Sequence, residues 1–228
     1  FRHLVTGNDM NATQLLHDLG QSLWLDNITR GLLTSGTLNR YIKELSITGL
    51  TSNPTIFDHA IQNGDFYDGA IRKKTLEGKS GEALFFELAL EDLGQAADLF
   101  RPIHDATGGM DGWVSLEVSP LLADDTSSTI KAAAPLHARA QRANLFIKIP
   151  GTGAGITAIE ETIFAGVPVN VTLLFSREQY VASAEAYMRG IERRLAAGRD
   201  PKGGSGASIF VSRWDVDVVD KVKGKFRN

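Results

Sequence analysis

The sequence predicts an α/β protein whose strands belong to a (β/α)8 barrel. Short apolar runs alternate with amphipathic stretches along the 228 residues, which is typical of a parallel sheet with helical crossovers. Polar residues occupy every second position of most apolar runs. This alternation favours a barrel with a polar mouth over an open sheet whose strands are apolar on both faces. About six strands are visible where such a barrel has eight, so we expect residues 10–228 to form a single barrel domain that lacks the last two βα units.

The elements follow from local signals. The predicted strands are 22–27, 47–53, 112–119, 145–150, 168–175 and 207–213. The predicted helices are 11–20, one that ends at 45, two between strands two and three of which the second covers 82–104, and then 126–142, 153–165 and 176–197. Asn11 is expected to cap the first helix, Pro54 to end the second strand, and Ser176 with Gln179 to form a capping box.

Alternation divides the strand residues between two faces. The apolar residues that we expect to face the helices are Leu23, Leu25, Leu116, Val118, Ile147, Ile149, Val169, Val171 and Leu173. The polar residues that we expect on the opposite face are Asp26, Thr51, Asn53, Ser115, Glu117, Ser119, Lys148, Asn170, Thr172 and Ser208. The C-terminal mouth of such a barrel is where its chemistry takes place.

Composition excludes several classes of protein. The chain has a formal net charge of -3 with dispersed Lys and Arg, which argues against a nucleic-acid partner. No apolar run is long enough to span a membrane, and no signal peptide is recognised, so a cytoplasmic location is expected. With no cysteine and five scattered histidines, we expect no metal and no cofactor. Residues 1–9 show no period and are interpreted as a disordered or appended lead, and the sequence predicts no oligomeric state.

Lys148 is the most informative residue. It stands alone within the apolar run 145–150, where an unpaired ammonium group would cost several kcal/mol. Burial favours the neutral amine, which is a nucleophile toward carbonyl carbon. Asp26 and Glu117 add two carboxylates for proton transfer, and Arg213 can bind a phosphate or a carboxylate. A lysine, two acids, several amides and hydroxyls and no metal ligands indicate Schiff-base chemistry on a polyhydroxy carbonyl compound.

Four segments then resemble the signatures of the transaldolase family. They are Gly49-Leu50-Thr51-Ser52-Asn53-Pro54-Thr55-Ile56-Phe57, Ile147-Lys148-Ile149-Pro150-Gly151-Thr152 with Gly155-Ile156, Asn170-Val171-Thr172-Leu173-Leu174-Phe175-Ser176, and Ser208-Ile209-Phe210-Val211-Ser212-Arg213. The lysine and N-x-T-L-L-F-S segments are specific together, and the likeness runs from about 10 to 217.

The resemblance implies a transaldolase of the pentose phosphate pathway with a TIM-type barrel. Such an enzyme transfers a dihydroxyacetone unit from sedoheptulose 7-phosphate or fructose 6-phosphate to glyceraldehyde 3-phosphate or erythrose 4-phosphate. Lys148 would form the Schiff base, Asp26 would move the C4 hydroxyl proton, and Glu117 with Thr172 would hold a catalytic water. The residues implied to bind substrate are Thr51, Asn53, Asn170, Ser208, Phe210 and Arg213.

Two other interpretations stay open. A fructose 6-phosphate aldolase-like lyase shares the lysine and the barrel, but that branch has Gln where this chain has Glu117 and Tyr where it has Phe210. A phosphate-binding module or an inactive barrel fragment is the more remote alternative. The segment 151–155 follows a strand but does not match G-x-G-x-x-G.

Overall fold

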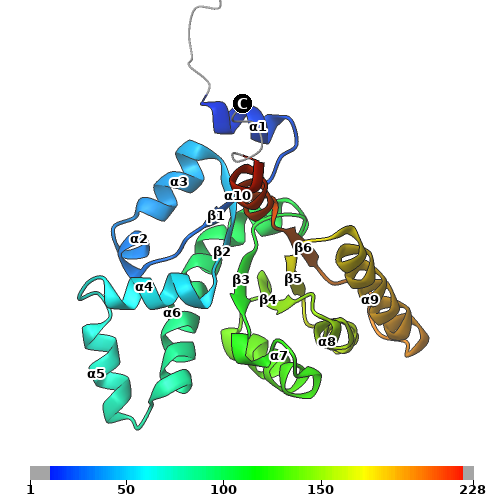
Figure 1. The fold of residues 1–228 in the computed structure, drawn as a ribbon. Helices are drawn as coiled ribbons and strands as arrows, with labels where there is room; N and C mark the ends of the chain where they lie inside the picture. Colours follow the sequence, from blue (N-terminus) through cyan, green and yellow to red (C-terminus); the bar gives the residue numbers. More distant parts are fainter. Residues whose placement is uncertain (1–10, 223–228) are drawn as a thin grey trace, which may run out of the picture. The chain divides into compact units, whose positions relative to one another are not determined.

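The structure is a computed structural model that describes residues 11–222, so the predicted lead at 1–9 lies outside the described residues. The chain forms two compact units, one ending at Val114 and the other beginning at Ser115. Figure 1 labels the strands and the α-helices of both units.

The first unit combines two parallel strands with six helices among its described residues. The strands are β1 (Leu23–Asp26) and β2 (Ile47–Thr51). The helices are α1 (Ala12–Asp18), α2 (Arg30–Thr34), α3 (Thr37–Leu45), α4 (Pro54–Gln62), α5 (Asp68–Leu76) and α6 (Gly81–Ala106). Backbone N–H groups of Gly112 and Leu50 bond to the carbonyls of Thr48 and Trp113, at 2.9 and 3.0 Å, which ties β2 to the segment that leads into the next strand.

Helix ends in this unit confirm some predictions and correct others. The side chain of Asn11 accepts a hydrogen bond from the Thr13 N–H and caps α1 as predicted. The single helix predicted up to residue 45 is two helices, because Gly36 has a left-handed conformation with φ 73° between α2 and α3. The two helices predicted before residue 104 are three, since Gly64 with φ 149° lies in the turn between α4 and α5.

The second unit holds four neighbouring strands, and β3 starts at the boundary. The strands are β3 (Val114–Glu117), β4 (Leu145–Pro150), β5 (Val169–Leu174) and β6 (Ser205–Ile209), in that order in the sheet. The helices are the 3₁₀ turn η1 (Pro120–Leu122), α7 (Thr126–Ala140), α8 (Gly153–Phe164), α9 (Arg177–Ala196) and α10 (Val211–Val222). The pairs β4–β5 and β5–β6 are parallel. Parallel strands in chain order with helices between them confirm the predicted α/β class of the (β/α)8 type.

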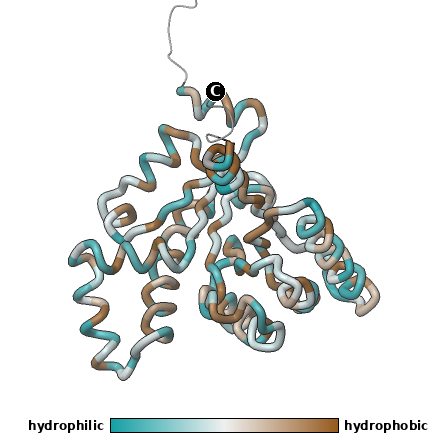
Figure 2. Tube along the Cα trace, in the orientation of Figure 1, coloured by the Kyte–Doolittle hydropathy of each residue, from teal (hydrophilic) through white to brown (hydrophobic). Residues whose placement is uncertain are grey.

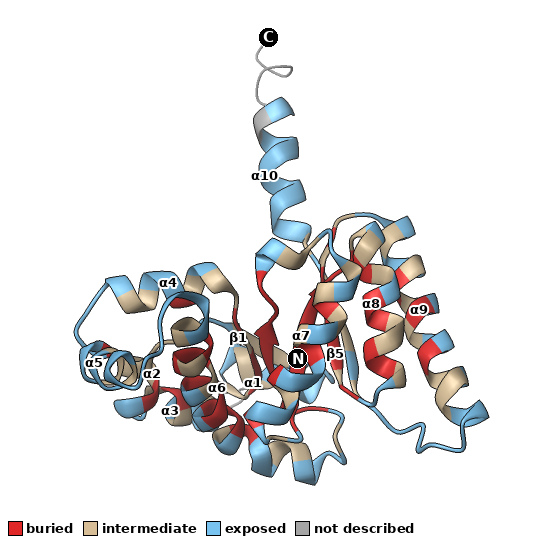
Figure 3. Cartoon of the chain, turned by 90° about the horizontal axis from the view of Figure 1, so that it is seen from below, coloured by how far each residue is buried: buried red, intermediate tan, exposed pale blue. Residues whose placement is uncertain are grey.

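The core of the second unit follows the predicted alternation. Leu116, Val118, Ile147, Ile149 and Val169 are each at most 1% exposed. Figure 3 shows buried residues concentrated in the strands and on one side of α8, whereas the residues of α10 whose burial is described are exposed. Around the turns of α9, hydrophilic and hydrophobic residues alternate, as Figure 2 shows. Burial of these side chains contributes about 1.5–3 kcal/mol each for a residue of the Val, Leu or Ile type.

The capping box of α9 has the predicted residues in a shifted geometry. The Ser176 hydroxyl accepts from the Gln179 N–H at 3.2 Å. The Gln179 side-chain oxygen accepts from the N–H of Phe175, one residue before the cap, at 2.9 Å. Both bonds satisfy N–H groups that a helix start leaves open, and they fix the point where β5 turns into α9.

The sixth strand ends earlier than predicted. β6 stops at Ile209, its last ladder partner is Leu174, and the Phe210 N–H bonds to the Leu174 carbonyl at 2.9 Å. From Val211 the chain is helical, so Arg213 lies in the first turn of α10 and not at the end of a strand. Val211, Trp214 and Val218 recur at helical spacing, and this period outweighs the strand-like composition that suggested a longer strand.

Candidate active site

Lys148 lies in the middle of β4, and Glu117 is the last residue of β3. All six residues of β4 are buried, and Lys148 is 5% exposed. Its Nζ lies 3.2 Å from Oε2 of Glu117, whose side chain is 10% exposed. A buried ammonium needs such a partner, because its transfer from water costs several kcal/mol. The structure therefore places an amine and a carboxylate within proton-transfer distance in a site shielded from water.

Glycine allows the chain to turn sharply directly after this strand. A Cβ on Gly155 would overlap the carbonyl oxygen of Pro150, so only glycine lets α8 start against the end of β4. The Thr152 hydroxyl accepts from the Gly155 N–H at 3.0 Å and donates to the Ala123 carbonyl at 2.6 Å. The segment that follows Lys148 is thus held by a cap, a close backbone approach and a bond to the loop before α7.

Asn170 and Thr172 lie on β5 beside β4. Lys148 is in register with Asn170, and Pro150 is in register with Thr172. The Asn170 Nδ2 donates to Ser115 Oγ at 3.1 Å, and the Ser208 Oγ donates to Asn170 Oδ1, also at 3.1 Å. The structure thus brings together Glu117, Lys148, Asn170, Thr172 and Ser208 within the second unit.

The backbone of β5 is irregular next to Thr172. Leu173 has a left-handed conformation with φ 56°, and the register with β6 shifts between Val171 and Leu174. The prediction that Leu173 continues the outward apolar row is therefore wrong: Leu174 is fully buried and Leu173 is not. The hydroxyl oxygen of Thr172 is buried and has no hydrogen-bond partner among the described residues. A buried hydroxyl left open costs about 1–3 kcal/mol, which marks Thr172 as a group available to a ligand.

Phe210 and Arg213 lie beyond the end of β6. The Phe210 ring stacks on Phe175, with centroids 5.4 Å apart and 22° between the planes. The guanidinium carbon of Arg213 lies 5.2 Å from the centroid of the Phe210 ring, and Arg213 is exposed. The arrangement holds the arginine over an aromatic ring where it can still reach an anion.

Three predicted residues belong to the first unit. Asp26 ends β1, is exposed, and is in register with Thr51 on β2. The Thr51 hydroxyl is buried without a hydrogen-bond partner among the described residues. The Asn53 side-chain oxygen accepts from the Ile56 N–H at 2.9 Å and caps α4. Asn53 therefore caps a helix, and this bond uses one lone pair of its amide oxygen and neither of its N–H donors.

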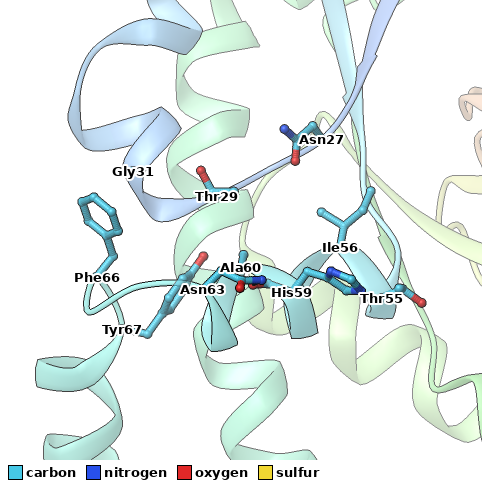
Figure 4. Close-up of a pocket in the computed structure, with 10 residues that line it drawn as sticks. All are labelled: Asn27, Thr29, Gly31, Thr55, Ile56, His59, Ala60, Asn63, Phe66 and Tyr67. Carbon is cyan, nitrogen blue, oxygen red and sulfur yellow. The ribbon is translucent and has the colours of Figure 1, made fainter.

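The first unit also contains a cavity of about 520 Å³, whose lining includes Asn27, Thr55 and Phe66 (Figure 4). Asn27 comes directly after Asp26, and Thr55 comes two residues after Asn53. The lining of the cavity combines side-chain amides and hydroxyls with the ring of Phe66, which lies against Gly31. The predicted site residues are not among the described residues that line this cavity.

Sequence reasoning missed a buried polar cluster in the first unit. Asp92 on α6 is fully buried, accepts from the Tyr67 hydroxyl at 2.7 Å and from Arg30 Nε at 2.9 Å. The Arg30 guanidinium also lies 4.7 Å from the centroid of the Tyr67 ring. Burial, and then the hydrogen bond to Asp92, raise the pKa of Tyr67 well above its usual value. Arg30 and Asp92 are 62 residues apart, and no local pattern connects them.

In the part of the chain that the structure describes, no helix is both long and apolar enough to cross a membrane.

Comparisons with known proteins show which family the chain resembles over most of its length. The family model described as transaldolase/fructose-6-phosphate aldolase matches residues 23–227. Curated relatives named transaldolase include that of Thermobifida fusca, 46% identical over 206 residues, which are 90% of this chain and 56% of the relative. That of Trichodesmium erythraeum is 42% identical over 213 residues, 93% of this chain and 56% of the relative. That of Thiobacillus denitrificans is 42% identical over 216 residues, 94% of this chain and 60% of the relative.

The chain spans about half the length of the curated relatives that it matches. The family model nevertheless covers both compact units, from the start of β1 to beyond α10. The chain belongs to the transaldolase/fructose-6-phosphate aldolase family.

Proposed function

We propose that the protein is a transaldolase that carries a dihydroxyacetone unit on Lys148. The observation that carries the proposal is the buried Lys148–Glu117 pair at 3.2 Å, in a chain that belongs to this family. The substrates would be a ketose phosphate as donor and an aldose phosphate as acceptor, and the enzyme would need no cofactor. A cytoplasmic location is part of the same proposal.

In the proposed reaction, the Lys148 amine attacks the C2 carbonyl carbon of the ketose phosphate. The resulting carbinolamine loses its C2 oxygen as water and becomes an imine. Glu117 lies close enough to the amine to take its proton before attack and to supply a proton to the departing hydroxyl. The open Thr172 hydroxyl would hold the water through which these protons move.

Cleavage of the C3–C4 bond then needs a base for the C4 hydroxyl proton, and we assign this role to Asp26. The bonding electrons pass to the imine and leave an enamine on Lys148, while the departing half of the sugar becomes an aldehyde. The acceptor aldehyde reacts with the enamine carbon, and Asp26 returns the proton to the new hydroxyl. Hydrolysis of the imine frees the product and the lysine.

Covalent trapping tests this proposal directly. Borohydride added with fructose 6-phosphate is expected to leave a reduced three-carbon adduct on Lys148, located by peptide mass mapping. Lys148→Met keeps the length of the side chain and removes the amine, so it should abolish the adduct, and its circular dichroism spectrum checks that the variant is folded. Lys131→Met is the matched control, because Lys131 is an exposed lysine on α7 of the same unit and should leave trapping unchanged. An adduct on another lysine, with Lys148 unmodified, would overturn the assignment.

A fructose 6-phosphate aldolase is the second candidate, because the matching family model covers both activities. Both reactions pass through the same enamine on the lysine. They differ in whether the enamine waits for an aldehyde or is protonated and released as free dihydroxyacetone. The ratio of dihydroxyacetone release to transfer onto erythrose 4-phosphate therefore separates the two activities.

A further inference from the structure

The amide of Asn170 is held at both ends by serine hydroxyls. Its nitrogen donates to Ser115 on β3, and its oxygen accepts from Ser208 next to the end of β6, both at 3.1 Å. Ser115 is fully buried and Asn170 is 3% exposed. An asparagine amide in water rotates freely about its last bond, whereas two hydrogen bonds at opposite ends fix its plane.

The bond between Ser115 and Asn170 skips a strand. β4 lies between β3 and β5 in the sheet, so the two side chains meet across it. Ser115 precedes Glu117 by two residues and shares its face of β3, and Glu117 contacts Lys148. Asn170 is itself in register with Lys148. The hydrogen bond from Asn170 to Ser115, called the bridge below, therefore crosses β4 on the face that carries the lysine amine.

The two bonds to serine use only part of the hydrogen-bonding capacity of the Asn170 amide. The amide has two N–H donors and an oxygen with two lone pairs, and the two serines use one donor and one lone pair. A donor and an acceptor in a fixed plane beside the amine suit a hydroxyl group of the three-carbon unit attached to Lys148. Without Ser115 the bond from Ser208 would be the one side-chain restraint on the amide that is described here, and binding of the substrate would have to supply the remaining order.

We infer that Ser115 is a positioning residue that presents the Asn170 amide to the three-carbon unit on Lys148. The inference rests on the proposed function. Ser115 acts through Asn170, so its loss should weaken substrate binding and leave the chemistry of the lysine intact.

The test measures the fructose 6-phosphate concentration that gives half-maximal borohydride trapping on Lys148 in the full chain. Ser115→Ala should raise this concentration roughly 2- to 12-fold, the range expected for one hydrogen bond, with the same final yield of adduct. Ser115→Cys keeps the shape and a weaker hydrogen-bonding group, so its value should fall between the two. Ser183→Ala is the matched control, since Ser183 is a buried serine of the same unit that bonds within α9.

A double-mutant cycle distinguishes positioning from general loss of structure. In an Asn170→Ala background, Ser115→Ala should add no further change to the half-saturating concentration. The Asn170 side-chain amide signal in ¹H–¹⁵N NMR spectra reports the bridge separately, and Ser115→Ala should shift it and make its protons exchange faster with water.

Equal half-saturating concentrations for the wild-type chain and Ser115→Ala would overturn the inference while the proposed function stands. So would additive effects in the cycle. If the wild-type chain forms no adduct on Lys148, the proposed function itself fails and the role of Ser115 fails with it, whatever the NMR signal shows.

Discussion

The buried Lys148–Glu117 pair should affect the free energy of unfolding as well as the reactivity of Lys148. Glu117→Leu removes the carboxylate and leaves an ammonium group in a strand that is buried throughout. At 3.2 Å and an effective dielectric constant of about 20, the gross attraction between the charges is about 5 kcal/mol. Removing one partner of a buried pair typically costs about 3–5 kcal/mol, and we expect the free energy of unfolding to fall by that amount.

The double variant Lys148→Met/Glu117→Leu should regain the free energy of unfolding that Glu117→Leu alone loses. Apolar residues of similar volume in place of a buried ion pair are often neutral or stabilising by about 1–4 kcal/mol. We therefore expect the double variant to be at least as stable as the wild-type chain, and to form no adduct with fructose 6-phosphate. The wild-type pair would then be present for the reaction and not for the fold.

Urea denaturation followed by circular dichroism measures these differences. Lys221→Met is the control, because Lys221 pairs with Asp217 on exposed α10 and its loss should change stability by less than about 1 kcal/mol. The reasoning is refuted if Glu117→Leu costs less than about 1 kcal/mol, or if the double variant is as unstable as that single variant.

Three further outcomes are expected. Phe210→Tyr puts a phenolic donor where a ring now stacks on its neighbour, and should raise free dihydroxyacetone release relative to transfer; an unchanged product ratio would contradict this. Gln141 is exposed after α7 and has a left-handed conformation with φ 50°, which is strained for a residue with a side chain. Gln141→Gly should therefore raise the free energy of unfolding, measured by denaturation, by about 1 kcal/mol, and a loss of stability would refute the argument. The hydrogen bond from Arg189 lowers the pKa of Glu160. The stabilisation of the fold by this pair is therefore fully present above the usual glutamate pKa and is lost as pH falls through the lowered pKa. Glu160→Gln should make the melting temperature depend less on pH on the acid side, and an unchanged pH dependence would show that the pair does not stabilise the fold.

Much of the fold could be predicted because its signals are local and periodic. All six strands lie where apolar runs were found, and β4 has the predicted bounds 145–150. Helix starts followed from caps at Asn11 and Ser176, whose side chains bond within three residues. The errors lie where one residue changes the backbone: Gly36 divides a helix, and left-handed Leu173 shifts the outward row by one position.

The sequence by itself determined which residue types the candidate site contains, since alternation assigns Glu117, Lys148 and Asn170 to one face. Only the tertiary structure decided which of them touch. The bond from Asn170 to Ser115 spans 55 residues of chain and crosses an intervening strand, so it depends on the register of the strands and not on any local period. Register in turn is set by how the apolar faces pack on their helices, and that packing is a property of the whole unit that no short stretch of sequence contains.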